Sequence, residues 1–194
     1  MKKIGIIVPS FMEGQLLDIK GIKNIELSIS GMGKVRAALG VVELIKKGCK
    51  SILLTGYAGG LYGLKMGDVV TPYAVIEGDY HAEPFEKYPN SLVLNNIFLK
   101  HAKHCSLITQ DMFLKKNIYK EQLFDGVDLA TDMEAYAVAY FCRQLGIKLY
   151  VVKIISDVVG AKSEKNFLDS CTKLSEQLSF VIKKSIEQIR KEEK

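Results

Sequence analysis

The chain has 194 residues, a length typical of one domain with a single sizeable core. Hydrophobic residues make up 48% of it, which argues against disorder, and no apolar run is long enough to cross a bilayer. The net charge of +5 comes from scattered lysines without a basic stripe interleaved with aromatic residues, so the composition argues against nucleic-acid binding.

Apolar strands and amphipathic helices alternate along the chain, which we interpret as one domain, residues 1–194. Residues 1–10 contain two lysines and an apolar stretch that is too short for a signal peptide, so they predict the first strand. The alternation predicts an α/β fold with a curved, mixed but mostly parallel sheet flanked by helices. The predicted strands span residues 3–8, 24–30, 51–55, 68–76, 105–109, 128–131 and 148–156, and the predicted helices span residues 34–47, 91–104, 116–124, 134–145 and 164–192. We expect the mixed segment 68–76 to bend from one sheet edge to another.

The cysteines and histidines indicate a protein without a metal. The four cysteines form no CxxC pair and no close metal spacing, which is typical of a reducing cytoplasm. His101 and His104 lie three residues apart beside Cys105, but no carboxylate joins them. We therefore predict a cytoplasmic protein with no metal and no cofactor.

The segment LYVVKIISDVVG, residues 149–160, is the most informative stretch. Its unbroken apolar run predicts a strand covered on both faces, and the run ends at Ser156 and Asp157. Ligands of open α/β sheets bind just outside the carboxyl ends of such strands. Asp157 is therefore well placed to give a proton to a ligand.

Two glycine-rich segments also follow predicted strands. In SGMGKVRAALG, residues 30–40, Arg36 occupies the position of the third glycine of the dinucleotide fingerprint, so the segment is either a ligand-binding turn or a plain strand-to-helix turn. We interpret TGYAGGL, residues 55–61, as a loop. Its glycines either let the backbone pack against a flat or bulky group or only allow the chain to turn.

Carboxylates follow two more strands. One group is Asp132, Met133 and Glu134. The two carboxylates could bind the hydroxyls of a sugar with the methionine against its apolar face, or the segment could simply begin a helix. For Asp132 alone we favour a helix cap. Glu13 in FMEGQ follows the first strand, and by itself it is more typical of a surface residue.

Together these segments resemble the purine nucleoside phosphorylase superfamily, most closely its 5′-methylthioadenosine/S-adenosylhomocysteine nucleosidases. The resemblance covers nearly the whole chain and follows the family's order, through IGII, SGMGKVRAALG, TGYAGGL, MGDVV, DMEA and ISDV. It implies a three-layer α/β/α fold, a cytoplasmic homodimer, a purine nucleoside as ligand and a place in purine metabolism and methionine salvage.

The resemblance also implies cleavage of a ribosyl N-glycosidic bond, with adenine released from a 5′-substituted adenosine by water. Asp157 would protonate N7 of the purine, and Glu13 would activate the water, as the second carboxylate of an inverting glycosidase does. Glu134 would hold the ribose hydroxyls, and Met133 would pack beneath the sugar. The other residues that the resemblance assigns to the substrate are Phe113, which stacks on the base, Leu114, which offers backbone hydrogen bonds, and Tyr57, Ala58, Gly59 and Ser156, while Gly33 and Lys153 belong to the water or anion site.

Several departures from the family leave alternatives open. Tyr57 replaces a small residue, Lys153 replaces an arginine, and the region between Gly14 and Ser30 is much shorter than in the nucleosidases. A different alignment of the first strand would put Gln15 in the place of Glu13. A phosphate-dependent phosphorylase and a catalytically inactive nucleoside-binding protein are the alternative functions.

Overall fold

The structure of the protein is a computed structural model that describes residues 2–80, 90–119, 126–160 and 163–193. Its helices are α1 (Phe11–Gln15), α2 (Lys34–Lys46), α3 (Ala135–Gln144), α4 (Ser163–Lys173) and α5 (Ser175–Glu192). Its strands are β1 (Ile4–Val8), β2 (Ile25–Ile29), β3 (Ser51–Leu54), β4 (Tyr57–Tyr62), β5 (Val69–Val70), β6 (Ala74–Glu77), β7 (Ser91–Val93), β8 (Ser106–Thr109), β9 (Leu129–Asp132), β10 (Lys148–Val151) and β11 (Lys153–Val158).

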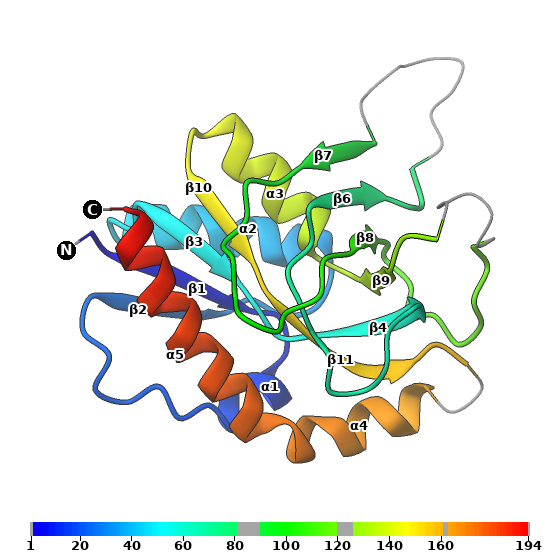
Figure 1. Ribbon diagram of the computed structural model, residues 1–194. Coiled ribbons are helices and arrows are strands. Elements are labelled where there is room, and N and C mark those ends of the chain that lie inside the picture. Colours follow the sequence, from blue (N-terminus) through cyan, green and yellow to red (C-terminus); the bar gives the residue numbers. More distant parts are fainter. Residues whose placement is uncertain (1, 81–89, 120–125, 161–162, 194) are drawn as a thin grey trace.

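The strands form a curled sheet in two parts. The first part, in the order β10-β3-β1-β2, is entirely parallel, and the second, in the order β5-β11-β4-β9-β8-β6-β7, is mixed. The chain runs from the first part into the second at β3–β4 and again at β10–β11, and it returns to the first part from β9 through α3 (Figure 1). At this bend the amide of Val152 donates to Leu54 O, and the amide of Ile154 donates to Gly56 O, each over 3.0 Å. The predicted single-domain α/β fold with a curved mixed sheet is confirmed.

Helices cover the sheet on both faces. In Figure 1, α2 and α3 lie together on one side, whereas α5 crosses the other side and α4 runs along β11. Alternate residues of β3 face opposite ways, since Ile52 and Leu54 pack in one apolar cluster with α2 and α3 while Leu53 packs in another with α5. This two-sided burial explains why β3 is apolar throughout.

Three predicted helices differ from the structure. The segment predicted as a helix over residues 91–104 contains β7 and an irregular stretch, because Asn96 bonds the edge of the sheet instead: its amide group pairs with both N and O of Val151. The predicted helix 164–192 is two helices, which break at Leu174, a residue packed against the core. Of the predicted helix 116–124, residues 116–119 are not helical and the rest lies outside the described residues.

Two strand predictions and one loop prediction also need correction. The segment 68–76 is divided by Pro72 into β5 and β6, which lie near opposite ends of the mixed sheet part. The segment 148–156 is divided at Val152 into β10 and β11. The segment 55–61, interpreted as a loop, contains most of strand β4, where a Cβ at Gly59 would lie 3.1 Å from Val159 and 3.3 Å from Thr131. Its glycines therefore allow close packing within a sheet.

Candidate active site

One cavity gathers the predicted site residues from five segments of the chain. Of the predicted residues, those that line it are Glu13, Tyr57, Ala58, Gly59, Phe113, Leu114, Met133, Glu134, Ser156 and Asp157. Gln15 is exposed at the end of α1 and does not line the cavity, so of the two candidates only Glu13 faces it. Gly33 and Lys153 do not line the cavity either, but each contacts the carboxylate of Glu134, Gly33 through its amide and Lys153 through its Nζ.

Glu13 is turned inward by a helix cap. Ser10 and Glu13 form a capping box, in which the amide of Glu13 donates to Ser10 Oγ over 3.1 Å and the amide of Ser10 donates to Glu13 Oε2 over 2.9 Å. The amide of Tyr57 donates to the other oxygen, Oε1, over 2.7 Å. Gly56 makes room, because a Cβ there would lie 2.7 Å from Oε1 and its φ is 118°. Glu13 is therefore a fixed, buried carboxylate.

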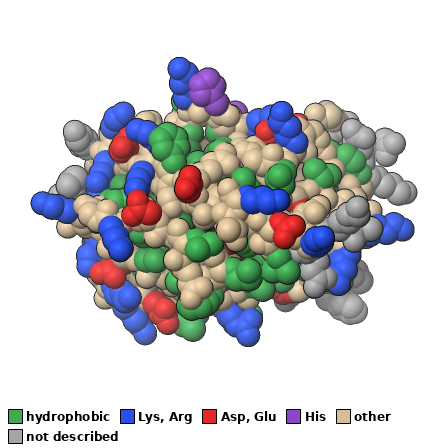
Figure 2. Space-filling model, turned by 90° about the horizontal axis from the view of Figure 1, so that it is seen from below, with side chains coloured by type: hydrophobic (Ala, Val, Ile, Leu, Met, Phe, Trp, Pro, Cys, Tyr) green, Lys and Arg blue, Asp and Glu red, His purple; other side chains and the backbone are tan. Residues whose placement is uncertain are grey.

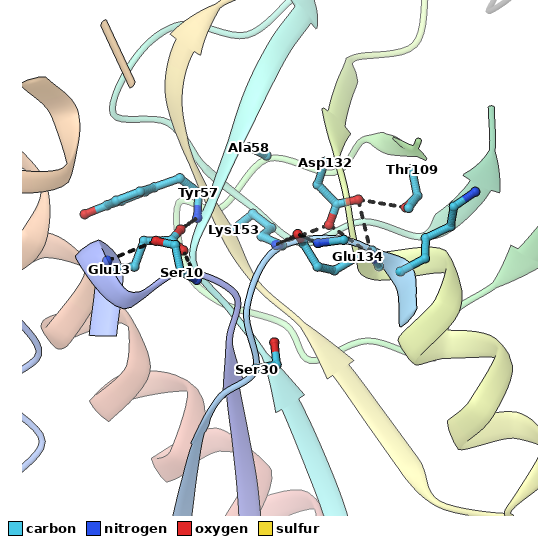
Figure 3. A network of polar contacts seen from close by, with 12 residues as sticks. Ser10, Glu13, Ser30, Tyr57, Ala58, Thr109, Asp132, Glu134 and Lys153 are labelled. Carbon is cyan, nitrogen blue, oxygen red and sulfur yellow. Dashed lines mark hydrogen bonds and ion pairs between the residues drawn. The ribbon is translucent and has the colours of Figure 1, made fainter. Parts of the chain in front are cut away.

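Lys153 lies between the acidic groups of the site, with Asp132 and Glu134 on one side and Glu13 on the other (Figure 3). Its side chain is 0% exposed, and its Nζ lies 3.2 Å from Asp132 Oδ2 and 3.7 Å from Glu134 Oε2. Burial alone would lower the pKa of Lys153, but the charges of Asp132, Glu134 and Glu13 outweigh it and raise that pKa. Lys153 is thus the counter-charge of a buried acidic site.

Asp132 and Glu134 have further partners that fix them. Asp132 accepts hydrogen bonds from Thr109 Oγ1 over 2.7 Å and from the amide of Ala135 at the start of α3. Asp132 therefore bonds the first amide of α3, but the N-cap residue of that helix is Glu134 and not Asp132 as expected. The pairing of Asp132 with Lys153 is a role that sequence reasoning missed. Glu134 Oε1 accepts from the amide of Gly33 over 2.9 Å, so the glycine turn before α2 holds this carboxylate through its backbone.

Asp157 enters the cavity through an irregularity of β11. The register between β11 and β4 shifts between Ile155 and Asp157, so that Ser156 and Asp157 both line the cavity although they are adjacent in a strand. Ser156 Oγ donates to Asp157 Oδ1 over 2.6 Å, and Ser170 Oγ of α4 donates to Ser156 O over 2.6 Å. Asp157 is 3% exposed. The strand end thus presents a buried carboxyl held by a hydrogen bond.

Three aromatic rings meet along the cavity. Phe167 of α4 makes edge contacts with Phe113, at 5.9 Å between ring centroids, and with Tyr57, at 6.3 Å. Tyr57 also donates its hydroxyl to Cys171 O over 3.4 Å. Sequence reasoning missed Phe167, because α4 comes close to the site only through the fold.

Glu134 predicts a pH dependence of stability. Burial, opposed by Lys153 and supported by the charge of Asp132, raises its pKa to about 7. Because this carboxyl binds its proton more tightly in the folded protein, its contribution is full below about pH 4.5 and is lost as the pH rises through about 7. Each unit of pKa difference corresponds to about 1.4 kcal/mol of unfolding free energy. The free energy of unfolding, measured with urea between about pH 5 and 8, should therefore fall more steeply with pH in the wild type than in Glu134→Gln. Equal slopes would contradict the raised pKa of Glu134.

Metal-binding clusters, membrane-spanning helices and charged surface patches are three other kinds of feature that could carry a function. Within the described ranges, no group of three or more His, Cys, Asp and Glu residues is arranged to hold a metal ion. Among the helices that the structure describes, none is long and apolar enough to cross a membrane. On the face that carries α4 and α5, Lys and Arg side chains are interspersed with Asp and Glu (Figure 2).

Comparisons with known proteins identify the family of the chain. Residues 11–187 match the family described as the phosphorylase superfamily. The 5′-methylthioadenosine/S-adenosylhomocysteine nucleosidase of Oceanobacillus iheyensis is 30% identical over 180 residues, which cover 81% of this chain and 76% of that protein. The enzyme of the same name from Buchnera aphidicola is 29% identical over 186 residues, which cover 82% of this chain and 78% of that protein.

A solved structure shares the fold. A Helicobacter pylori MTAN mutant with 5′-methylthioadenosine in its active site aligns with a TM-score of 0.81 at 20% identity, covering 96% of this chain and 99% of that one. The match of residues 11–187 spans most of the chain, and the relatives align over most of their own lengths. The chain therefore belongs to the phosphorylase superfamily, in its 5′-methylthioadenosine/S-adenosylhomocysteine nucleosidase branch.

Proposed function

We propose that the protein hydrolyses the N-glycosidic bond of a purine nucleoside and releases adenine from a 5′-substituted adenosine such as 5′-methylthioadenosine or S-adenosylhomocysteine. The observation that carries the proposal is the meeting of three buried carboxyl groups, Asp157, Glu13 and Glu134, in one cavity. The names of the aligned relatives support the substrate class.

Each carboxyl group has a distinct task in this reaction. Asp157 donates a proton to N7 of the purine, which makes the base a better leaving group. Glu134 accepts hydrogen bonds from the ribose hydroxyls, with Met133 against the sugar, and its negative charge favours the oxocarbenium-like transition state. Glu13 takes a proton from the attacking water. Burial raises the pKa of Glu13, which strengthens it as a base, and the charge of Lys153 partly opposes that rise.

The neighbouring segments bind the base. Phe113 lies in the cavity wall, where it stacks on the purine, and the backbone of Leu114 offers hydrogen bonds to the base edge. Tyr57, Ala58 and Gly59 of β4 complete the wall.

Water is the acceptor that suits this cavity better than phosphate. Among the described residues that line it there are four Asp and Glu side chains and no Lys or Arg. Lys153 is already paired with Asp132 and Glu134. Arg36, a second cation near the Gly33 turn, donates to Met32 O over 3.2 Å and does not line the cavity. A phosphate dianion would meet net negative charge, which is unfavourable.

The function is tested by measuring base release from a panel of purine nucleosides with and without phosphate. The panel contains methylthioadenosine, S-adenosylhomocysteine, 5′-deoxyadenosine, adenosine, inosine and futalosine, with chromatography of the products. We expect free adenine without phosphate from at least one 5′-substituted adenosine. Strict dependence on phosphate with formation of a ribose 1-phosphate would make the protein a phosphorylase. Tight binding without release from any nucleoside would make it an inactive binding protein.

Glu13→Gln tests the assignment of the water-activating group. We expect kcat to fall by about 10²- to 10⁴-fold, the usual contribution of a general base, while the nucleoside still binds. The single oxygen of glutamine can accept from the amide of Tyr57 or from that of Ser10 but not from both, so thermal unfolding of the variant is measured alongside. Gln15→Ala is the matched control, since Gln15 is exposed outside the cavity, and its kcat should stay at the wild-type value. A large loss in Gln15→Ala and not in Glu13→Gln would reverse the assignment.

We also propose that the protein works as a homodimer in the cytoplasm, where its reaction would serve methionine salvage. The face formed by α2 and α3 supports the dimer, because Val35 is 83% exposed, Leu39 58% and Phe141 38%. The four free, buried cysteines fit a reducing compartment. Light scattering should give twice the mass of the chain, and Leu39→Glu should yield the monomer if this face is the interface.

A further inference from the structure

Lys34, the first residue of α2, lies among three carboxylates beside the cavity. Its Nζ is 2.6 Å from Asp79 Oδ1, 3.0 Å from Glu77 Oε1 and 3.4 Å from Asp111 Oδ2. The Lys34 side chain is 16% exposed, so the ammonium is largely withdrawn from water. Without its charge, three carboxylates would face one another at short range, where like charges repel strongly.

Backbone hydrogen bonds extend this cluster. The amide of Lys34 donates to Asp111 Oδ1 over 3.3 Å, so Asp111 contacts both ends of the same residue. The amide of Asp111 in turn donates to Asp79 Oδ2 over 2.8 Å. The contacts tie together three segments, which are the chain after β6, the loop after β8 and the start of α2.

Two of these segments continue directly into the cavity. Asp111 precedes Met112, Phe113 and Leu114, which line it. Lys34 follows Gly33, whose amide holds Glu134. A shift of the cluster would therefore displace both the base-binding segment and a partner of the ribose-binding carboxylate.

We propose that Lys34 is a positioning residue that holds segment 111–114 and the Gly33 amide in the arrangement that binds the nucleoside. The inference rests on the proposed function, because it uses the assignment of the base to Phe113 and Leu114. Lys34 does not line the cavity and acts through its neighbours. Although burial alone would lower the pKa of Lys34, its hydrogen bonds to Asp79 and Glu77 raise it, so the residue stays charged at neutral pH.

Kinetics of Lys34→Met, Lys34→Arg and Lys103→Met test the proposal. In Lys34→Met we expect KM to rise by about 10- to 100-fold with kcat nearly unchanged, because binding geometry is lost and the reacting groups remain. Lys34→Arg keeps the charge and should recover most of the affinity. Lys103→Met is the matched control, since Lys103 pairs with Asp68 over 2.9 Å outside the cavity lining, and its KM should stay at the wild-type value. An unchanged KM in Lys34→Met, or an equal rise in Lys103→Met, would overturn the proposal.

A second variant and a readout independent of catalysis complete the test. The Asp111 side chain is 56% exposed, so Asp111→Asn should fold normally and raise KM by itself. Its effect should be less than additive with that of Lys34→Met, since both act on the same segment. Hydrogen exchange at residues 111–114 should be faster in both variants than in the wild type. If the wild type releases no base, the proposed function fails while exchange still decides the positioning role, and unchanged exchange in both variants would refute that role.

Discussion

Asp157→Asn is expected to lower the rate of base release by about 10²- to 10⁴-fold, the range that general-acid catalysis contributes. An amide has nearly the shape of a carboxylic acid but gives up no proton to the departing base. Its oxygen can still accept the hydrogen bond that Ser156 Oγ now gives to Asp157 Oδ1. The fold should therefore persist, and the loss should appear in kcat and not in stability.

The measurement compares single-turnover adenine release, thermal unfolding and nucleoside binding in the wild type and the variant. Asp169→Asn serves as the control, because Asp169 is an exposed aspartate on the neighbouring helix α4 and should behave like the wild type. Full activity in Asp157→Asn would remove Asp157 as the acid. A loss of both activity and folding would instead assign Asp157 to the stability of the β11 bulge.

The location of the site was predictable from the chain because it depends on local patterns. An apolar strand followed by a polar residue marks a strand end, as at Asp157 and Glu134. That the two meet was not readable from the sequence, because β11 and β9 flank β4 and run antiparallel to each other. Helices α2 and α3 were predictable for the same reason, since each has its own amphipathic period. The capping box of Ser10 and Glu13 was also readable, as Ser-x-x-Glu after a strand, and it would have indicated that Glu13 is fixed and not a free surface residue.

The remaining features depend on partners that are distant in sequence. Asn96 bonds Val151, 55 positions away, and this contact replaces the helix that local propensity favours. Strand β4 contains two adjacent glycines, a composition typical of loops, and becomes a strand because β9 and β11 pair with it on either side. The burial of Lys153 is another such feature, because an apolar strand with one lysine does not reveal which acids surround that lysine.

Lys153→Met should lower the free energy of unfolding by about 3–5 kcal/mol, the cost of leaving buried charges without their partner. Methionine fills a similar volume, so the expected loss arises from the acids Asp132, Glu134 and Glu13 and not from a cavity. Lys183→Met is the matched control, because Lys183 pairs with Asp18 over 3.0 Å at the surface, where an ion pair contributes at most about 1 kcal/mol.

The pH dependence of this loss separates charge from packing. Without the cation the pKa values of Glu13 and Glu134, which burial already raises, should rise further, because Lys153 no longer opposes that rise. They accept protons more readily in the folded protein, so the destabilisation of Lys153→Met relative to the wild type should shrink towards about pH 5 and grow towards about pH 8. Urea unfolding at both pH values measures this difference. A loss of stability that is equal at both would mean that Lys153 matters through its packing, and the view of this site as acids held together by one buried cation would be wrong.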